Sequence, residues 1–189
     1  MYRYGEEISY KFELLKTGDY NNLQFFECGN ERLDNHIKSN VIKTNEIVDE
    51  DGLYFKFTDL ITQKIIGIVS LASSGIIYKV SNYTHVLPAI KIDVLAVDKD
   101  YQKLHYDFAS ENDPNPDNHY YFSDDIIGTT IKHCRDISEN YTLVNYIVLY
   151  ADKKAYRYYE RNGFENYTEY MVKENNQEIN KNIPMYLKL

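Results

Sequence analysis

Alternating and continuous apolar runs divide the chain into strand signals. Residues 90–97 (IKIDVLAV) alternate strictly, with isoleucine, valine and alanine on one face, and give the strongest strand signal. Residues 146–150 (YIVLY) form a short continuous apolar run that is typical of a buried strand. Residues 53–58 alternate and residues 64–72 are largely apolar, so these two segments predict a hairpin. Further strands are expected at residues 8–15, from Phe164 onward and at residues 183–189.

Helical spacing and capping residues predict three helices between these strands. In the first, which Asn30 is placed to cap, apolar residues recur every fourth position at Leu33, Ile37 and Val41. The second is expected to begin with Ser123 as its N-cap and to have two aspartates in its first turn. The third spans residues 152–161 and ends at Gly163. Residues 73–86 are expected to form a polar connection.

This order of elements predicts one α/β domain covering residues 1–189. The length suits one compact domain, and the chain contains no internal repeat and no segment that resembles an interdomain linker. The strands at 90–97 and 146–150 are joined through a helix, so they should be parallel neighbours. Residues 98–122, rich in Asp, Asn and Pro, interrupt the pattern and are expected to form an atypical acidic loop insertion.

Composition excludes several classes of protein. Hydrophobic residues make up 43% of the chain and charged residues 26%, so a packed core is expected and general disorder is not. The N-terminus lacks the apolar run of a signal peptide, and no run of 18 apolar residues predicts a membrane-spanning helix. Two cysteines, Cys28 and Cys134, are too few for a disulfide scaffold and fit a cytoplasmic protein, with both expected to be buried. The five histidines lack metal-ligand spacing, so no metal is expected.

The net charge of −8 is concentrated in one segment. Residues 98–125 contain eight acidic residues and two basic ones, Lys99 and Lys103, a net charge of −6. This argues against a nucleic-acid surface at that segment, although not elsewhere in the chain.

Three segments resemble a known family. Residues 95–102 (LAVDKDYQ), 155–164 (AYRYYERNGF) and 26–33 (FECGNERL) resemble N-acetyltransferases of the GNAT superfamily, and the last is similar to a subgroup that includes toxin acetyltransferases. The resemblance implies a single mixed, mostly antiparallel sheet with a splayed parallel strand pair and flanking helices. It also implies transfer of an acetyl group from acetyl-CoA to a primary amine of a small molecule or peptide.

The resemblance assigns roles to individual residues. The main chain of Leu95, Ala96 and Val97 would bind the pantetheine arm and polarise the acetyl carbonyl. Tyr159 would be the general acid, because a phenol with a pKa of about 10 can protonate a thiolate whose pKa is about 8.5 or above. Tyr159 could instead pack the helix on the sheet. Asp93 could deprotonate the incoming ammonium, although a salt-bridged surface carboxylate is the simpler interpretation.

The expected cofactor loop departs from the family pattern. Gln102, Ser123, Asp152 and Ala155 match positions that contact the cofactor, but the glycine loop that should follow Gln102 is missing, with no glycine before Gly128. Such a loop and the helix after it bind the pyrophosphate through main-chain N–H groups. In one account, the amides at residues 123–126 still bind the phosphates, with the aspartates pointing outward. In the other, the phosphate site is lost, and the protein uses a different donor or is a non-catalytic binding module.

The acceptor and partners stay open. The acidic segment could attract a cationic acceptor such as a polyamine or lysine. The alternative is a toxin that acetylates aminoacyl-tRNA and has an antitoxin partner, for which the available basic surface is Lys153, Lys154, Arg157 and Arg161. That surface could equally meet cofactor phosphates or be an ordinary solvated helix face. A homodimer is compatible with the sequence, and a membrane partner is not expected.

Overall fold

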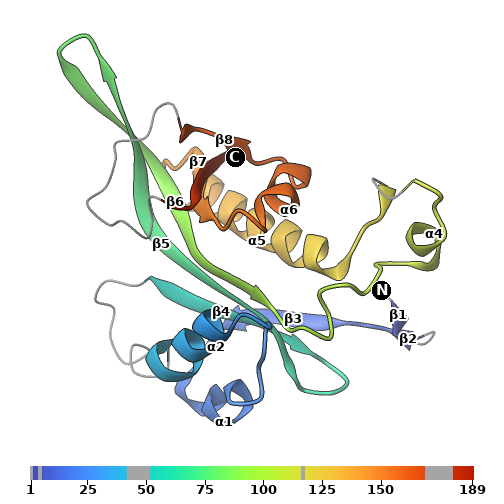
Figure 1. Cartoon of the computed structure of the whole chain (residues 1–189). Coiled ribbons are helices and arrows are strands. Elements are labelled where there is room, and N and C mark those ends of the chain that lie inside the picture. Colours follow the sequence, from blue (N-terminus) through green and yellow to red (C-terminus); the bar gives the residue numbers. More distant parts are fainter. Residues whose placement is uncertain (1, 4–5, 42–51, 116–117, 169–180) are drawn as a thin grey trace. The chain divides into compact units, whose positions relative to one another are not determined.

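The structure is a computed structural model that describes residues 2–3, 6–41, 52–115, 118–168 and 181–189 (Figure 1). Its strands are β1 (Tyr2–Arg3), β2 (Glu6–Glu7), β3 (Tyr10–Leu14), β4 (Leu53–Asp59), β5 (Ile65–Val80), β6 (Tyr83–Val97), β7 (Tyr146–Ala151), β8 (Glu165–Asn166) and β9 (Ile183–Lys188). Its helical segments are η1 (Thr17–Asp19), α1 (Tyr20–Leu23), α2 (Glu31–His36), the π-helical η2 (Ile37–Val41), α4 (Phe108–Glu111), α5 (Phe122–Asn140) and α6 (Tyr156–Arg161).

The main sheet is mixed, as predicted. Its strand order is β3-β4-β5-β6-β7-β9-β8, and β1 and β2 form a separate antiparallel pair. β6 and β7 are parallel, whereas the β3–β4, β7–β9 and β8–β9 pairs are antiparallel. No helix among the described residues is long and apolar enough to cross a membrane.

The chain divides into two compact units. The first unit comprises Met1–Ser70 and Val94–Gly128, and the second comprises Leu71–Asp93 and Thr129–Leu189. The long strands β5 and β6 and the helix α5 each contribute residues to both units.

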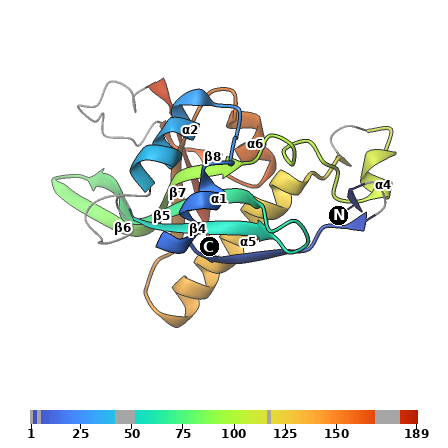
Figure 2. The same cartoon turned by 90° about the horizontal axis from the view of Figure 1, so that it is seen from below.

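The strands of the first unit are covered on both faces. On one face, where α1 and α2 lie, the segment from α1 to the start of η2 buries Leu23, Phe26 and Ile37 in one cluster with Tyr54 and other core residues of the sheet (Figures 1 and 2). Phe57, three positions after Tyr54, points to the opposite face, where the start of α5 packs. There Phe122 and Ile126 are completely buried. Burial of this apolar area is the main favourable term for folding of the unit.

In the second unit, a continuous antiparallel pair supports the apolar run at β7. Every residue from Tyr146 to Ala151 pairs with β9, from Lys188 back to Ile183. Ala89, Val148 and Tyr167 form a buried cluster in this unit. β7 is therefore a buried central strand, as its sequence predicts.

The prediction of a polar connection at residues 73–86 was wrong. These residues lie in a long hairpin of β5 and β6, which turns at Ser81 with a left-handed φ of 54° (Figure 1). Serine and glycine at the start of the segment suggested a loop, but the β-branched and aromatic residues after them favour strands. Tyr78 and His85 stack across the hairpin, with ring centroids 5.1 Å apart.

Helix ends agree only partly with the predictions. Asn30 caps α2 as expected, because its side chain accepts the Leu33 N–H at 3.3 Å. Ser123 is not an N-cap, since α5 already begins at Phe122. The third predicted helix begins at Tyr156, four residues late, because a turn at Asp152 precedes it. The acidic segment, expected to be a loop, also contains the short helix α4. The predicted burial of Val41 falls on a side chain outside the described residues.

Candidate active site

The parallel pairing of β6 with β7 ends before either strand does. It runs from Ala89 opposite Tyr146 to Ile92 opposite Leu149, while β6 continues to Val97. β7 keeps pairing with β9 up to Ala151. The main chain of β6 after Ile92 is therefore not paired with β7, as expected for a splayed parallel pair. Leu95 is half-buried, and Ala96 and Val97 are buried.

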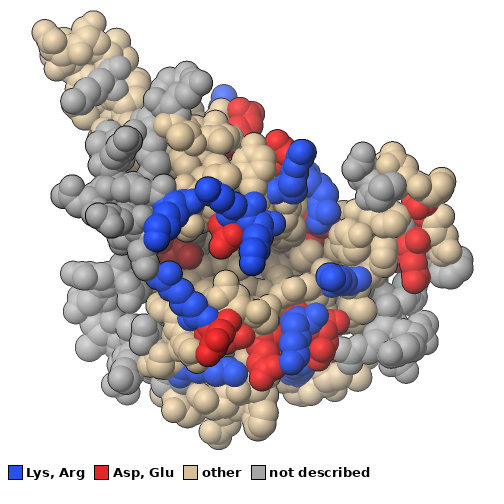
Figure 3. All heavy atoms as spheres, viewed as in Figure 1, with Lys and Arg blue, Asp and Glu red and all other residues tan. Residues whose placement is uncertain are grey.

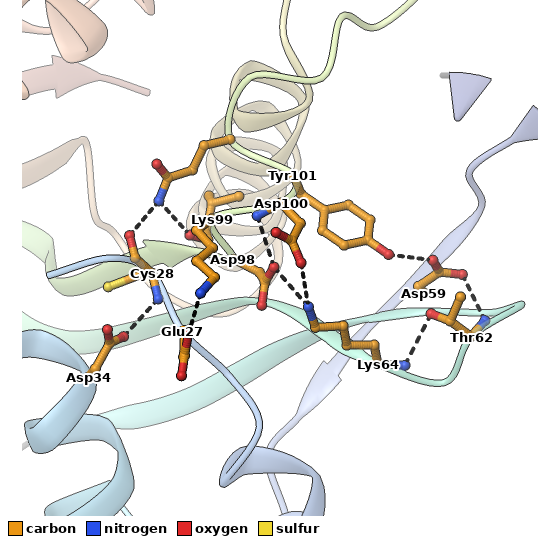
Figure 4. A network of polar contacts seen from close by, with 12 residues as sticks. Glu27, Cys28, Asp34, Asp59, Thr62, Lys64, Asp98, Lys99, Asp100 and Tyr101 are labelled. Carbon is orange, nitrogen blue, oxygen red and sulfur yellow. Dashed lines mark hydrogen bonds and ion pairs between the residues drawn. The ribbon is translucent and has the colours of Figure 1, made fainter. Parts of the chain in front are cut away.

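A network of charged side chains holds the loop that follows β6 (Figure 4). Asp98 is completely buried, and its Oδ1 accepts bonds from Lys64 Nζ at 3.0 Å and from the Asp100 N–H at 3.1 Å. Lys64 Nζ also lies 3.2 Å from Asp100 Oδ2. Burial alone would lower the pKa of Lys64, but the Asp98 and Asp100 carboxylates outweigh it and raise that pKa. Asp98 Oδ2 is buried and has no hydrogen-bond partner among the described residues.

Tyr101 and Gln102 fix the end of the loop, residues 98–102. The Tyr101 side chain is completely buried, and its hydroxyl donates to Asp59 Oδ2 at 2.8 Å. Burial opposes the charge on Asp59, but the N–H of Ile61 and the Tyr101 hydroxyl stabilise it, and the pKa of Asp59 is lowered. Gln102 Nε2 donates to the carbonyls of Cys28 at 2.7 Å and Val97 at 2.8 Å. Its amide group thus ties β6 to the segment before α2.

Residues 26–29 (the FECG segment), which precede α2, contain the groups that bind this loop. The Lys99 N–H donates to the Glu27 carbonyl at 2.8 Å, and the two side chains form an ion pair at 2.5 Å. The Cys28 N–H donates to Asp34 Oδ1 at 2.7 Å, and Gly29 takes a left-handed φ of 80°. Burial, together with the Asp34 carboxylate, raises the pKa of the Cys28 thiol to about 11, so Cys28 is a protonated and poorly nucleophilic thiol at neutral pH.

The acidic insertion leads directly into α5. A β-bridge joins His105 to Tyr121 at its base. Asp124 is buried, with Oδ2 accepting the Tyr121 N–H at 2.8 Å, and Asp125 Oδ2 accepts the Tyr10 hydroxyl at 2.6 Å. Burial, followed by the Asp125 and Asp124 charges, raises the pKa of Tyr120 to about 12. Both first-turn carboxylates therefore bind donors of the protein itself.

Tyr159 lies on α6 in the second unit. Its ring packs edge-on against Tyr158 and Phe164, with centroid distances of 5.1 and 5.7 Å. Its hydroxyl makes no hydrogen bond to any residue in the described part of the chain. Burial raises the pKa of Tyr159 well above that of free phenol, so the phenol is neutral at pH 7.

The remaining predicted residues of the second unit have local partners. Asp152 Oδ1 accepts the Lys154 N–H at 2.8 Å, and the Asp152 carbonyl accepts the Ala155 N–H at the same distance. Asp93 forms an ion pair with Lys91 at 2.6 Å, so the alternative of a salt-bridged surface carboxylate describes it well. Lys91 Nζ also lies 5.4 Å from the centre of the Tyr150 ring.

Sequence reasoning missed the residues that hold the loop at 98–102. Lys64 lies 34 residues before Asp98 and Asp59 lies 42 residues before Tyr101, and the turn that contains them has no motif of its own. A lysine next to a buried strand was the only available signal. Within the described residues, no group of three or more His, Cys, Asp or Glu side chains could hold a metal ion.

Several solved structures share this fold. A bacterial toxin aligns with a TM-score of 0.69 and 17% identity, covering 96% of this chain and 91% of its own. A mutant AtaT toxin bound to the C-terminus of the antitoxin AtaR and acetyl-CoA has a TM-score of 0.63 and 16% identity, with coverages of 95% and 92%. AtaT complexed with acetyl-methionyl-tRNAfMet has a TM-score of 0.63 and 15% identity, and 95% of each chain is covered.

The likeness is therefore one of fold and not of close sequence. No protein-family model and no curated protein sequence matches the chain. The structural matches extend over nearly its whole length and include the mixed sheet with its parallel pair. The chain has the fold of these solved toxins, in agreement with the resemblance of its three sequence segments to the GNAT superfamily.

Proposed function

We propose that this protein is an N-acetyltransferase that transfers the acetyl group of acetyl-CoA to a primary amine of a small molecule or peptide. The observation that carries the proposal is that β6 continues after Ile92 without pairing with β7. Its main-chain groups can hydrogen-bond an amide-containing pantetheine arm, as a neighbouring strand would. An N–H group in the same stretch can stabilise the oxyanion that forms when an amine attacks a thioester. This assigns Leu95, Ala96 and Val97 to the donor.

Tyr159 supplies the proton for the leaving thiolate in this proposal. Its hydroxyl is protonated at neutral pH and has no competing partner in the described part of the chain. Asp93 is the candidate base, but it would first have to separate from Lys91. Gln102 contributes by holding the Val97 carbonyl, while Ser123, Asp152 and Ala155 stay predicted cofactor contacts.

Calorimetric titration with acetyl-CoA, together with a thiol-release assay on a panel of amines, tests the proposal. Tyr159→Phe should bind acetyl-CoA as the wild type does but release CoA about 100 to 1,000 times more slowly, because general acid catalysis contributes on that order. Tyr156→Phe is the matched control, since the Tyr156 hydroxyl donates to Glu160 on the same exposed helix face. Absence of binding at millimolar acetyl-CoA would support the non-catalytic alternative.

The division of charge favours aminoacyl-tRNA as a second candidate acceptor. The first unit contains 20 acidic and 10 basic residues, whereas the second contains 9 acidic and 11 basic ones. Lys153 and Lys154 on the approach to α6 are exposed and form no ion pair with a described residue (Figure 3 shows basic side chains in this area). AtaT, which has the same fold, has been captured with acetyl-methionyl-tRNAfMet.

Binding of tRNA at increasing salt separates this candidate from a small-molecule acceptor. Lys153→Glu with Lys154→Glu should weaken tRNA binding and reduce the salt slope by about two units, because each phosphate contact contributes about 0.9. Lys11→Glu with Lys16→Glu makes the same change of charge in the first unit and should leave binding unchanged. Equal effects of the two double variants would reject a specific RNA surface near α6.

A further inference from the structure

In the loop after β6, the main-chain N–H groups of residues 98–102 are all bonded within the protein. The N–H of Asp98 donates to the Ile66 carbonyl at 3.0 Å and that of Lys99 to the Glu27 carbonyl. The next three N–H groups turn back onto the first residue of the loop. Asp100 donates to Asp98 Oδ1, and residues 101 and 102 donate to the Asp98 carbonyl at 2.9 and 3.1 Å. Five consecutive amides, from 98 to 102, are thus used inside the protein.

At the start of α5, the N–H groups of residues 121, 122, 124 and 125 are also bonded within the protein. The Tyr121 N–H is bound by the Asp124 carboxylate, and the Phe122 N–H donates to the Leu104 carbonyl at 2.8 Å. The N–H groups of Asp124 and Asp125 both donate to the Tyr121 carbonyl, at 2.9 and 3.3 Å. A helix N-terminus binds anions through free N–H groups and its dipole. Here a carboxylate of the protein already takes the place of the anion.

The charges around these amides also oppose a pyrophosphate. Asp124 and Asp125 bring two carboxylates to the start of α5. Of the two lysines in the acidic segment, Lys99 is paired with Glu27. Lys103 is exposed and forms no ion pair with any residue that the structure describes. A single exposed lysine is a weak substitute for a glycine loop, because an exposed ion pair contributes little.

We propose that this protein recognises its thioester donor through the acyl-pantetheine arm and not through the pyrophosphate. S-acetylpantetheine, which has the same thioester and arm but no nucleotide, should then be nearly as good a ligand as acetyl-CoA. The inference rests on the proposed function, because it assigns the donor to the same β6 edge. In addition to the proposed function, the Asp98–Gln102 loop and the start of α5 make no favourable contact with the phosphates.

Calorimetric titration of the wild-type protein with the two donors is the primary test. The dissociation constants for acetyl-CoA and S-acetylpantetheine should agree within tenfold. A preference for acetyl-CoA above tenfold would overturn this inference while leaving the proposed function intact. If neither donor binds at millimolar concentration, the proposed function fails and this inference fails with it.

Three charge variants show where any preference arises. Asp125→Asn removes one carboxylate but keeps an acceptor for Tyr10, so acetyl-CoA should bind at least threefold tighter and S-acetylpantetheine equally well. Asp113→Asn is the matched control, because its carboxylate already accepts from Asn115 and Asn118, and it should change neither constant. Lys103→Ala should also change neither. Selective weakening of acetyl-CoA by Lys103→Ala would overturn the inference, because a phosphate contact would then exist.

Discussion

The segments that follow the parallel strands β6 and β7 are held in contrasting ways. After β6, the loop at residues 98–102 bonds to distant parts of the chain, through Lys64, Glu27 and Cys28. After β7, the turn at Asp152 bonds only to its own next residues, and the helix that follows presents Tyr159 without a hydrogen-bond partner in the described part of the chain. The first segment is tied to distant residues by several polar contacts, whereas in the second the Tyr159 hydroxyl has no hydrogen-bond partner among the described residues.

The largest expected effect comes from breaking the anchor of the first segment. Lys64→Met leaves the buried Asp98 carboxylate without its counter-ion. Removing one partner of a buried pair costs about 3–5 kcal/mol, and the partial exposure of Lys64 reduces this to about 2 kcal/mol. Urea unfolding should show that loss of stability. Lys99→Met removes the exposed ion pair with Glu27 and should cost clearly less stability than Lys64→Met, because water screens an exposed pair. Equal losses would contradict the special role of Asp98.

The link between β6 and the FECG segment should give the next effect. Gln102→Leu leaves the Cys28 and Val97 carbonyls without the amide that binds them and should destabilise the protein by about 1–2 kcal/mol. Gln24→Leu is a suitable control, because this glutamine is exposed at the end of α1. Thermal unfolding of both variants measures the difference. A Gln102→Leu protein as stable as its control would show that the link is dispensable.

The contrast also explains what the sequence could reveal. The strands at β6 and β7, their parallel pairing and the cap at Asn30 follow from local patterns, and the structure confirms them. The contact of Lys64 with Asp98 was not predictable, because long-range polar pairs leave no periodic signal. The hairpin at residues 73–86 was missed because cross-strand pairing outweighed the loop preference of its serines and glycine. The role of Tyr159 came from family resemblance and remains a prediction.

Cysteine labelling provides a smaller, local measure of the same link. With a pKa of about 11, Cys28 should react only slowly with iodoacetamide at pH 8. The Gln102→Leu variant lacks the amide that donates to the Cys28 carbonyl, so labelling of Cys28 should accelerate several-fold in this variant. Cys134, buried and with a pKa of about 12, is the internal reference and should not change. Mass spectrometry of the two peptides distinguishes local loosening from global unfolding, which would expose both thiols.

In the second segment, the protonation state of Tyr159 should not limit turnover between pH 7 and pH 10. Burial raises the pKa of Tyr159, so its proton-donating form persists from neutral pH to beyond pH 10 and is lost only as the pH rises through that higher value. At saturating acetyl-CoA and amine, turnover should therefore rise or stay level between pH 7 and pH 10, following deprotonation of the acceptor. Because the hydroxyl has no charged partner among the described residues, salt should not shift this behaviour. A descending limb below pH 10 that Tyr159→Phe abolishes would place the phenol in a more polar setting than this structure gives it. The same limb retained in Tyr159→Phe would assign it to another group.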